Sequence, residues 1–192
     1  MNSTPVNTFM SSILVPDRVG LLQNVTKAVF SLEGNIGAIR QTVVDGFFSL
    51  VFTSIHPEEV TAEALKAILA GTLEESAVVT VLNKEEPEPD KPLQGGPRYI
   101  VMTRGADKPG TICAISSFMV EHNINIEDWI VDEEDGKIIY IAQVVVPENI
   151  DFHKIQDDFK ERMAAINLTG LLCHENIFRA TNEIGPIKPL IG

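Results

Sequence analysis

The stretch VPDRVGLL, residues 15–22, decides the fold because it returns ninety residues later as GADKPGTI, residues 105–112. Each copy is followed by an Asn-Ile pair, at residues 35–36 and again at 125–126. Further residues match at the same offset without a gap: Gly20 and Gly110, Gly46 and Gly136, Pro57 and Pro147. Such matches at one fixed spacing indicate an internal repeat. The chain of 192 residues is therefore predicted to contain two units of about 80 to 90 residues each.

Apolar periodicity and turn residues predict the elements of the first unit. Asp17 is expected to cap the first helix, Gly34 to supply the left-handed residue that ends it, and Asp45-Gly46 to form a tight hairpin. The predicted strands are residues 9–15, 35–44, 47–56 and 76–83, and the predicted helices begin near residue 19 or 20 and at about residue 61. The order is strand, helix, strand, strand, helix, strand.

The second unit has the same predicted order, with Asp151 as the expected cap of its second helix. Its predicted strands are residues 98–104, 125–134, 137–146 and about 168–178, and its predicted helices are 109–122 and 152–166. With right-handed crossovers this order gives an α+β fold of two ferredoxin-like βαββαβ units, each a four-stranded antiparallel sheet with two helices on one face. The predicted division is a first domain at 1–83, an extended linker at 84–97, a second domain at 98–180 and a tail at 181–192 without a recognisable element.

Both faces of the predicted sheets carry apolar residues. In the third strand, Phe48, Leu50 and Phe52 alternate with Phe47 and Val51. The helices can cover only one face, so the other is expected to pack on the sister unit or on another protomer. This pattern predicts a homodimer or a larger closed oligomer.

Composition limits the classes of partner. A formal net charge of −12 opposes direct binding to nucleic acid or to an anionic membrane. The amino terminus lacks the basic region of a signal peptide, and the longest apolar run, residues 138–146, is too short to span a bilayer. We expect a cytoplasmic protein.

Catalytic and metal-binding patterns are not found in the sequence. Cys113 and Cys173 do not correspond in the repeat and are expected to be reduced, buried thiols. The four histidines lack the spacing of a zinc site, and no nucleophile with a base or glycine-rich nucleotide loop is recognisable. We therefore expect no enzyme activity, no metal and no cofactor.

The repeated loops are the candidate binding sites. Each has an Asp and a Gly before a helix, and each unit opens its second strand with Asn-Ile. A helix amino terminus can bind the carboxylate of a small zwitterion, and Asn or Asp oxygens can hold its ammonium. The alternative is that the loops are capping turns and that Asn35 and Asn125 simply begin strands.

The motif Asp-Arg-Val-Gly-Leu-Leu followed by Gly-Asn-Ile, in units of this order, resembles the ACT domain, a regulatory module of amino-acid metabolism. A tandem pair without other domains is similar in layout to the glycine cleavage system transcriptional repressor family. The resemblance implies a regulatory protein that binds a small amino acid, glycine or serine, where ACT units meet, and that controls a partner protein. The implied ligand-binding residues are Asp17, Arg18, Val19, Gly20, Asn35, Ile36, Asp107, Lys108, Pro109, Gly110, Asn125 and Ile126. The first loop departs from the family in having Val19 where proline is usual, which makes the second loop, with Pro109, the preferred site.

Two alternatives remain beside this interpretation. One is a ligand-free module that serves dimerisation or protein interaction. The other is RNA binding, because residues 45–52 superficially resemble the aromatic motif of RNA-recognition domains. The second is disfavoured, since Asp45 stands where that motif has a basic residue and Ser49 replaces a stacking aromatic.

Overall fold

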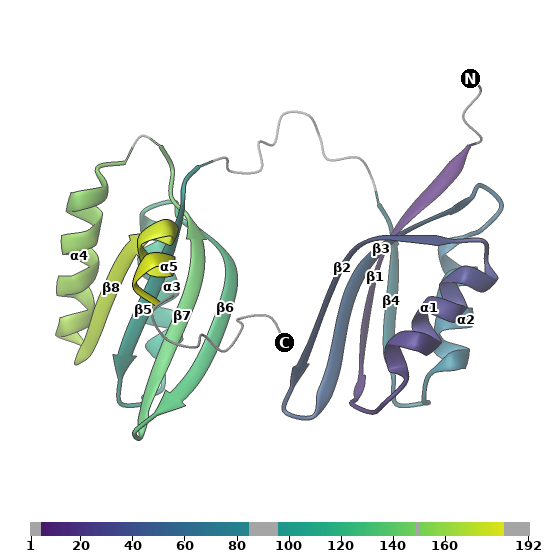
Figure 1. Cartoon of the computed structure of the whole chain (residues 1–192), viewed down its shortest axis with the longest axis horizontal. Helices are drawn as coiled ribbons and strands as arrows, with labels where there is room; N and C mark the ends of the chain where they lie inside the picture. Colours follow the sequence, from purple (N-terminus) through teal and green to yellow (C-terminus); the bar gives the residue numbers. More distant parts are fainter. Residues whose placement is uncertain (1–4, 85–95, 149, 183–192) are drawn as a thin grey trace. The chain divides into compact units, whose positions relative to one another are not determined.

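The computed structural model describes residues 5–84, 96–148 and 150–182, and of residues 179–182 the backbone alone. The chain divides into two compact units, one for each copy of the repeat (Figure 1). None of the helices in the described ranges is long and apolar enough to cross a membrane.

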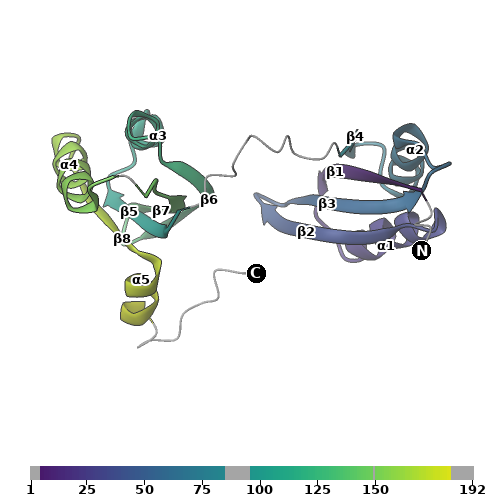
Figure 2. The same cartoon turned by 90° about the horizontal axis from the view of Figure 1, so that it is seen from above.

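The first unit is a four-stranded antiparallel sheet in the order β2-β3-β1-β4, with two helices packed on one face (Figures 1 and 2). Its elements are β1 (Val6–Pro16), α1 (Leu21–Ser31), β2 (Asn35–Val44), β3 (Phe47–Pro57), α2 (Ala62–Thr72) and β4 (Val78–Asn83).

The second unit repeats this arrangement in the order β6-β7-β5-β8, with α3 and α4 on one face. An additional short helix, α5, lies on the opposite face (Figure 2). The elements are β5 (Arg98–Gly105), α3 (Thr111–Glu121), β6 (Asn125–Glu134), β7 (Lys137–Val145), α4 (Phe152–Ala165), β8 (Leu168–His174) and α5 (Glu175–Asn182). The predicted α+β class and the two ferredoxin-like βαββαβ units are thus confirmed.

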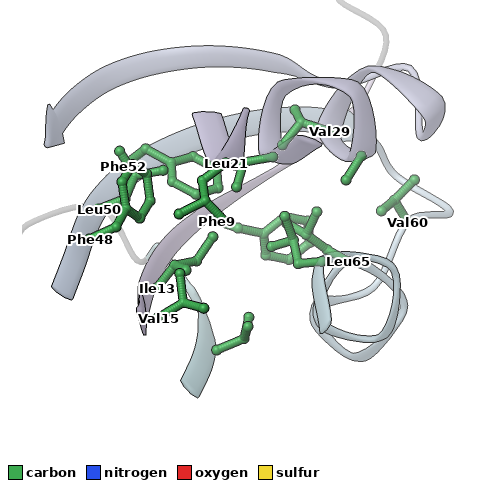
Figure 3. Close-up of a cluster of buried hydrophobic side chains, with 14 residues drawn as sticks. Phe9, Ile13, Val15, Leu21, Val29, Phe48, Leu50, Phe52, Val60 and Leu65 are labelled. Atoms are coloured by element: carbon green, nitrogen blue, oxygen red, sulfur yellow. The ribbon is translucent and has the colours of Figure 1, made fainter. Parts of the chain in front are cut away.

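Each unit has its own apolar core between sheet and helices. In the first, the side chains of Phe9, Leu21, Phe52 and Leu65 are at most 1% exposed and meet in the middle of the unit (Figure 3). In the second, Phe118 of α3 and Phe159 of α4 are buried with ring centroids 5.1 Å apart. Burial of one such side chain contributes about 1.5–3 kcal/mol to the stability of the fold, so these residues hold the helices against the sheet.

The two predicted hairpin turns are present. Asp45 and Gly46 have φ values of 48° and 77°, and Asp135 and Gly136 have 53° and 69°. Two successive residues at positive φ form a turn whose backbone twist matches the right-handed twist of the two strands that it joins. The Asp-Gly pairs therefore fix the register of β2 on β3 and of β6 on β7.

Two expectations about the ends of α1 are wrong. Asp17 does not cap the helix: the residue before α1 is Gly20, at φ 96°, with no side-chain cap, while the amide of Asp17 donates to the carbonyl of Gly46 at 2.8 Å. The left-handed residue that ends α1 is Glu33, at φ 53°, and not Gly34. Glycine is required at 34 for another reason, because a Cβ there would collide with the ring of His56.

The last strand is shorter than predicted. β8 ends at His174, which pairs with Tyr99, and the chain continues as α5 rather than as strand to Phe178. A strand that continued to Phe178 would run past the end of β5, which begins at Arg98, the residue next to the partner of His174. Residues 181 and 182 of the predicted tail are helical, and 183–192 lie outside the described residues.

The two cysteines and the ends of the predicted linker lie in the described part of the chain. Cys173 is a buried free thiol, but Cys113 is exposed on α3, which corrects the prediction that both are buried. Of the predicted linker, Lys84 donates its amide to Thr8 and Pro97 accepts from Val146, so both ends are tied to strands. Residues 85–95 lie outside the described part of the chain.

Replacement of Asp151 by alanine is expected to lower the free energy of unfolding by about 1 kcal/mol. Its carboxylate accepts from the amides of His153 and Lys154 at 3.1 and 3.3 Å, which confirms it as the cap of α4. Asp17→Ala is the matched control and should change stability little, because Asp17 caps no helix. Urea unfolding compares the two, and equal losses would contradict this assignment of caps.

Candidate functional site

The loop before α1 lies at the surface. Residues 16–20 are exposed, and Val19 is fully so. Arg18 forms an ion pair with Glu74 at 2.7 Å, with both side chains 45% exposed. An exposed pair of this kind stabilises little, but it draws the guanidinium of Arg18 toward the residues that follow α2.

The loop before α3 is held differently, through its aspartate. Tyr140, buried on β7, donates its hydroxyl to Oδ1 of Asp107 at 3.1 Å. Burial raises the pKa of Tyr140, and the hydrogen bond to the Asp107 carboxylate raises it further. The hydroxyl of Thr111 donates to the carbonyl of Lys108 at 2.9 Å. The second loop is thus anchored to the sheet and to the first turn of α3.

Tyr140 is a residue that the sequence reasoning missed as part of the site. The ninety-residue offset places it on Leu50, which is a plain core residue in the first unit. The sequence did contain a signal for this role. Tyr140 has a hydroxyl where the first repeat has leucine, and a buried hydroxyl needs a hydrogen-bond partner. That partner is one of the predicted site residues.

Both helices begin after a glycine in the left-handed region, Gly20 at φ 96° and Gly110 at φ 89°. A helix leaves its first amides without partners inside the helix, and glycine has no side chain to accept from them. A Cβ at either glycine would meet nothing within 4 Å, so the backbone conformation, not crowding within the unit, demands glycine here. At α3 the amide of Thr111 already donates to the carbonyl of Lys108 at 3.2 Å, so an anionic group would meet the next amides of α3 and the first amides of α1.

Asn35 and Asn125 begin β2 and β6 and are exposed. Neither amide side chain hydrogen-bonds to another residue in the described ranges. The residues that follow them, Ile36 and Ile126, pack against the two cores and are structural within the unit. Of these four predicted site residues, the two asparagines are therefore exposed polar groups and the two isoleucines are core contacts.

Within one unit the loop and the asparagine lie at opposite ends of the sheet. Asn35 pairs with Ile55, whereas the loop follows Pro16, which pairs with Phe47 at the other end of β3. Eight residues of strand separate these positions by about 26 Å. The second unit has the same arrangement, with Asn125 opposite Val145 and Gly105 opposite Ile138. No single unit brings its loop and its asparagine together around a small molecule.

Charged groups lie close to Asn125. Arg98 binds Glu127 through two hydrogen bonds of 2.7 and 3.3 Å, and Gln143 donates to the same carboxylate. The hydrogen bond from Arg98 lowers the pKa of Glu127. This carboxylate stays ionised near neutral pH, and both of its oxygens already accept hydrogen bonds from Arg98. Among the described residues, no three His, Cys, Asp or Glu side chains gather as metal ligands.

Comparisons with known proteins agree with this architecture. No family model matches the chain. The structure is similar to that of an unknown protein from Galdieria sulphuraria, with a TM-score of 0.72 and 15% identity over 88% of this chain and 99% of that one. It is also similar to a protein described as a “putative glycine cleavage system transcriptional repressor”, with a TM-score of 0.60 and 14% identity over 87% and 96% of the two chains.

The fold is that of tandem ACT domains. A curated relative from Methanopyrus kandleri, described as UPF0237 protein MK1213, matches a stretch about as long as one unit. It is 27% identical over 88 residues, which cover 45% of this chain and 98% of the relative. These likenesses establish the fold alone.

Proposed function

We propose that the chain is a non-catalytic regulatory protein that binds a small amino acid where ACT units meet and thereby modulates a partner protein. Glycine and serine are the first candidates for the ligand. Transcriptional control of glycine or one-carbon metabolism is the first setting to test, because one structural neighbour carries a repressor's description. We further propose that the chain acts as a homodimer and contacts its target through protein, since a charge of −12 opposes direct contact with nucleic acid.

The observation that supports this function best is the pairing of open donors and acceptors in both repeats. The first turn of each helix offers amides without a side-chain cap, and each second strand begins with an exposed asparagine whose side chain makes no hydrogen bond to a described residue. The amides suit a carboxylate, and the Asn oxygen suits an ammonium group. Because the two sets are at opposite ends of a unit, a second ACT unit has to complete the site, and a second copy of the chain can supply it.

The second loop is the better candidate of the two. Tyr140 holds Asp107 in place, whereas the structure shows no side-chain hydrogen bond from Asp17 to a described residue. A preorganised loop loses less conformational freedom on binding, which favours affinity. The loop of the second unit also contains Pro109, whose fixed φ restricts it further.

Thermal unfolding with each of the twenty amino acids tests the proposal. A ligand present at one hundred times its dissociation constant should stabilise an occupied site by about 2.7 kcal/mol. For a chain of this size the melting temperature should then rise by roughly 5 to 10 °C. Absence of a shift with every amino acid would favour the alternative function, a ligand-free dimerisation module.

Fluorescence of Trp129 can separate the two loops in the same experiment. It is the only tryptophan of the chain, and its ring centroid lies 6.2 Å from that of Tyr140. Ligand at the second loop should change this emission, whereas ligand at the first loop alone should leave it unchanged. A melting shift without a change in emission would assign binding to the first unit.

A further inference from the structure

The two sheets differ on the face that lies away from their long helices, which we call the open face. Strand pairing identifies equivalent positions on it. Met10 pairs with Leu82 in the first unit, and Ile100 pairs with Cys173 at the same place in the second. Leu82 is 60% exposed, whereas Cys173 is 9% and Ile100 7% exposed. The same corner of the sheet is therefore bare in one repeat and covered in the other.

Helix α5 provides the cover. It starts directly after β8, where the ring nitrogen Nδ1 of His174 accepts from the amide of Asn176 at 3.2 Å. It contacts β5 and β8 and lies on the open face of the second sheet (Figure 2). Phe178 is half-buried, whereas its neighbour Ile177 is 58% exposed. Among the described residues, no helix covers the open face of the first sheet.

The open face of the first unit is apolar and almost uncharged. Its exposed large apolar side chains are Val6, Leu14, Val44, Phe47, Val51, Ile55, Val78 and Leu82. Strand pairing places one ionisable residue, Arg40, on this face, and Lys84, whose amide donates to Thr8 just beyond β4, continues the same alternation. The open face of the second unit, in contrast, carries both signs of charge, including Arg104, Asp128 and Asp132. Only the open face of the first unit is a continuous exposed apolar surface.

We propose that the open face of the first unit docks onto the same face of a second copy of the chain, and that α5 occupies the apolar corner of the second open face so that docking through an open face is confined to the first unit. A second copy suits this surface because an apolar face with few charges and no carboxylate matches itself. Two chains of charge −12 can meet there without apposing carboxylates. A self-matching face gives a closed dimer with two-fold symmetry.

The size of the face is adequate for such a dimer. Four strands about 4.8 Å apart and about eight residues long cover roughly 500 Å² as a flat area. Side-chain relief adds to this figure, and a stable interface buries about 800 Å² on each partner. Aligned packing of two sheets through their apolar faces is a common arrangement. The proposal holds whether or not the chain binds an amino acid.

Light scattering of the full chain and two charge variants tests the docking surface. The wild type should have twice the chain mass of 21.1 kDa at tens of micromolar. Val51→Asp, in the middle of the face, should give a monomer. Phe30→Asp is the matched control: Phe30 is 79% exposed but lies on α1, so this variant should remain dimeric. A monomeric wild type, a dimeric Val51→Asp variant or a monomeric Phe30→Asp variant would each overturn the docking surface.

Circular dichroism separates loss of docking from loss of folding. Val51 is already 44% exposed, so Val51→Asp should keep the wild-type spectrum. If the spectrum is lost, Leu82→Asp at the edge of the same face takes its place, because its side chain is 60% exposed. A folded but dimeric Leu82→Asp variant would then reject the proposal.

Thiol modification tests the role of α5. In a Cys113→Ser background, Cys173 is the only thiol, and α5 should keep it slow to react with a thiol reagent. Phe178→Asp should detach α5 and accelerate the reaction roughly tenfold or more, because access controls the rate. Ile177→Asp introduces the same charge on the exposed side of α5 and should leave the rate unchanged. Equal rates for Phe178→Asp and the background protein would show that α5 does not cover this corner.

Discussion

Gly34→Ala is expected to lower the free energy of unfolding by about 1 to 3 kcal/mol, although it adds only a methyl group. The added Cβ would collide with the ring of His56, which is 1% exposed. The ring cannot easily move aside, because its nitrogens lie 3.2 Å from the carbonyl of Leu32 and 3.0 Å from the hydroxyl of Ser54. Urea or thermal unfolding measures the loss.

Gly71→Ala is the matched control for this prediction. Gly71 lies in α2 and a Cβ there would meet nothing within 4 Å. Because alanine favours the helical conformation, this variant should be unchanged or more stable by up to about 1 kcal/mol. The collision itself can be isolated with His56→Ala, which removes the ring. If Gly34→Ala costs as much in that background as in the wild type, the collision is not the cause.

Asn125→Ala is expected to remove most of the melting shift produced by the correct amino acid, a loss of roughly 5 to 10 °C. The side chain is exposed and makes no hydrogen bond to a described residue, so its removal should cost the unliganded protein less than about 0.5 kcal/mol. Asn35→Ala should have a smaller effect on the shift, because we propose that Asn125 of a second copy completes the preferred site at the second loop. The measurement is the same thermal titration used for the ligand screen.

Tyr140→Phe and Leu50→Ala complete the comparison. Tyr140→Phe removes the hydroxyl that holds Asp107 and should weaken ligand binding more than it weakens the fold. Leu50→Ala, at the equivalent core position of the first unit, should cost about 2 to 5 kcal/mol of stability without a specific effect on the second loop.

If both asparagine variants lose several kcal/mol of stability without ligand, and no amino acid shifts the melting temperature of the wild type, the asparagines are structural. The ligand-free dimerisation module is then the better function.

Local sequence was sufficient for most of the secondary structure. The Asp-Gly pairs at 45–46 and 135–136 predicted the two hairpins, because few residues accept two successive positive φ values. Asp151 predicted the start of α4, since a cap acts on amides only two and three residues away. Apolar periodicity then assigned the helices and strands, and the order of these elements led to the ferredoxin-like arrangement. The repeat of residues 15–22 at 105–112 doubled each of these predictions.

Tertiary structure decided what depends on residues distant in the chain. Gly34 is needed because His56, on β3, occupies the space where its side chain would be, and no local pattern contains that contact. Tyr140 reaches Asp107 across 33 residues. β8 ends at His174 because its partner strand begins at Arg98, and the apolar residues that follow pack as α5 on the sheet instead of continuing it. The sequence by itself therefore determined the elements and their order, through interactions within a few residues, whereas three-dimensional packing decided how the second loop is anchored and which sheet face remains open.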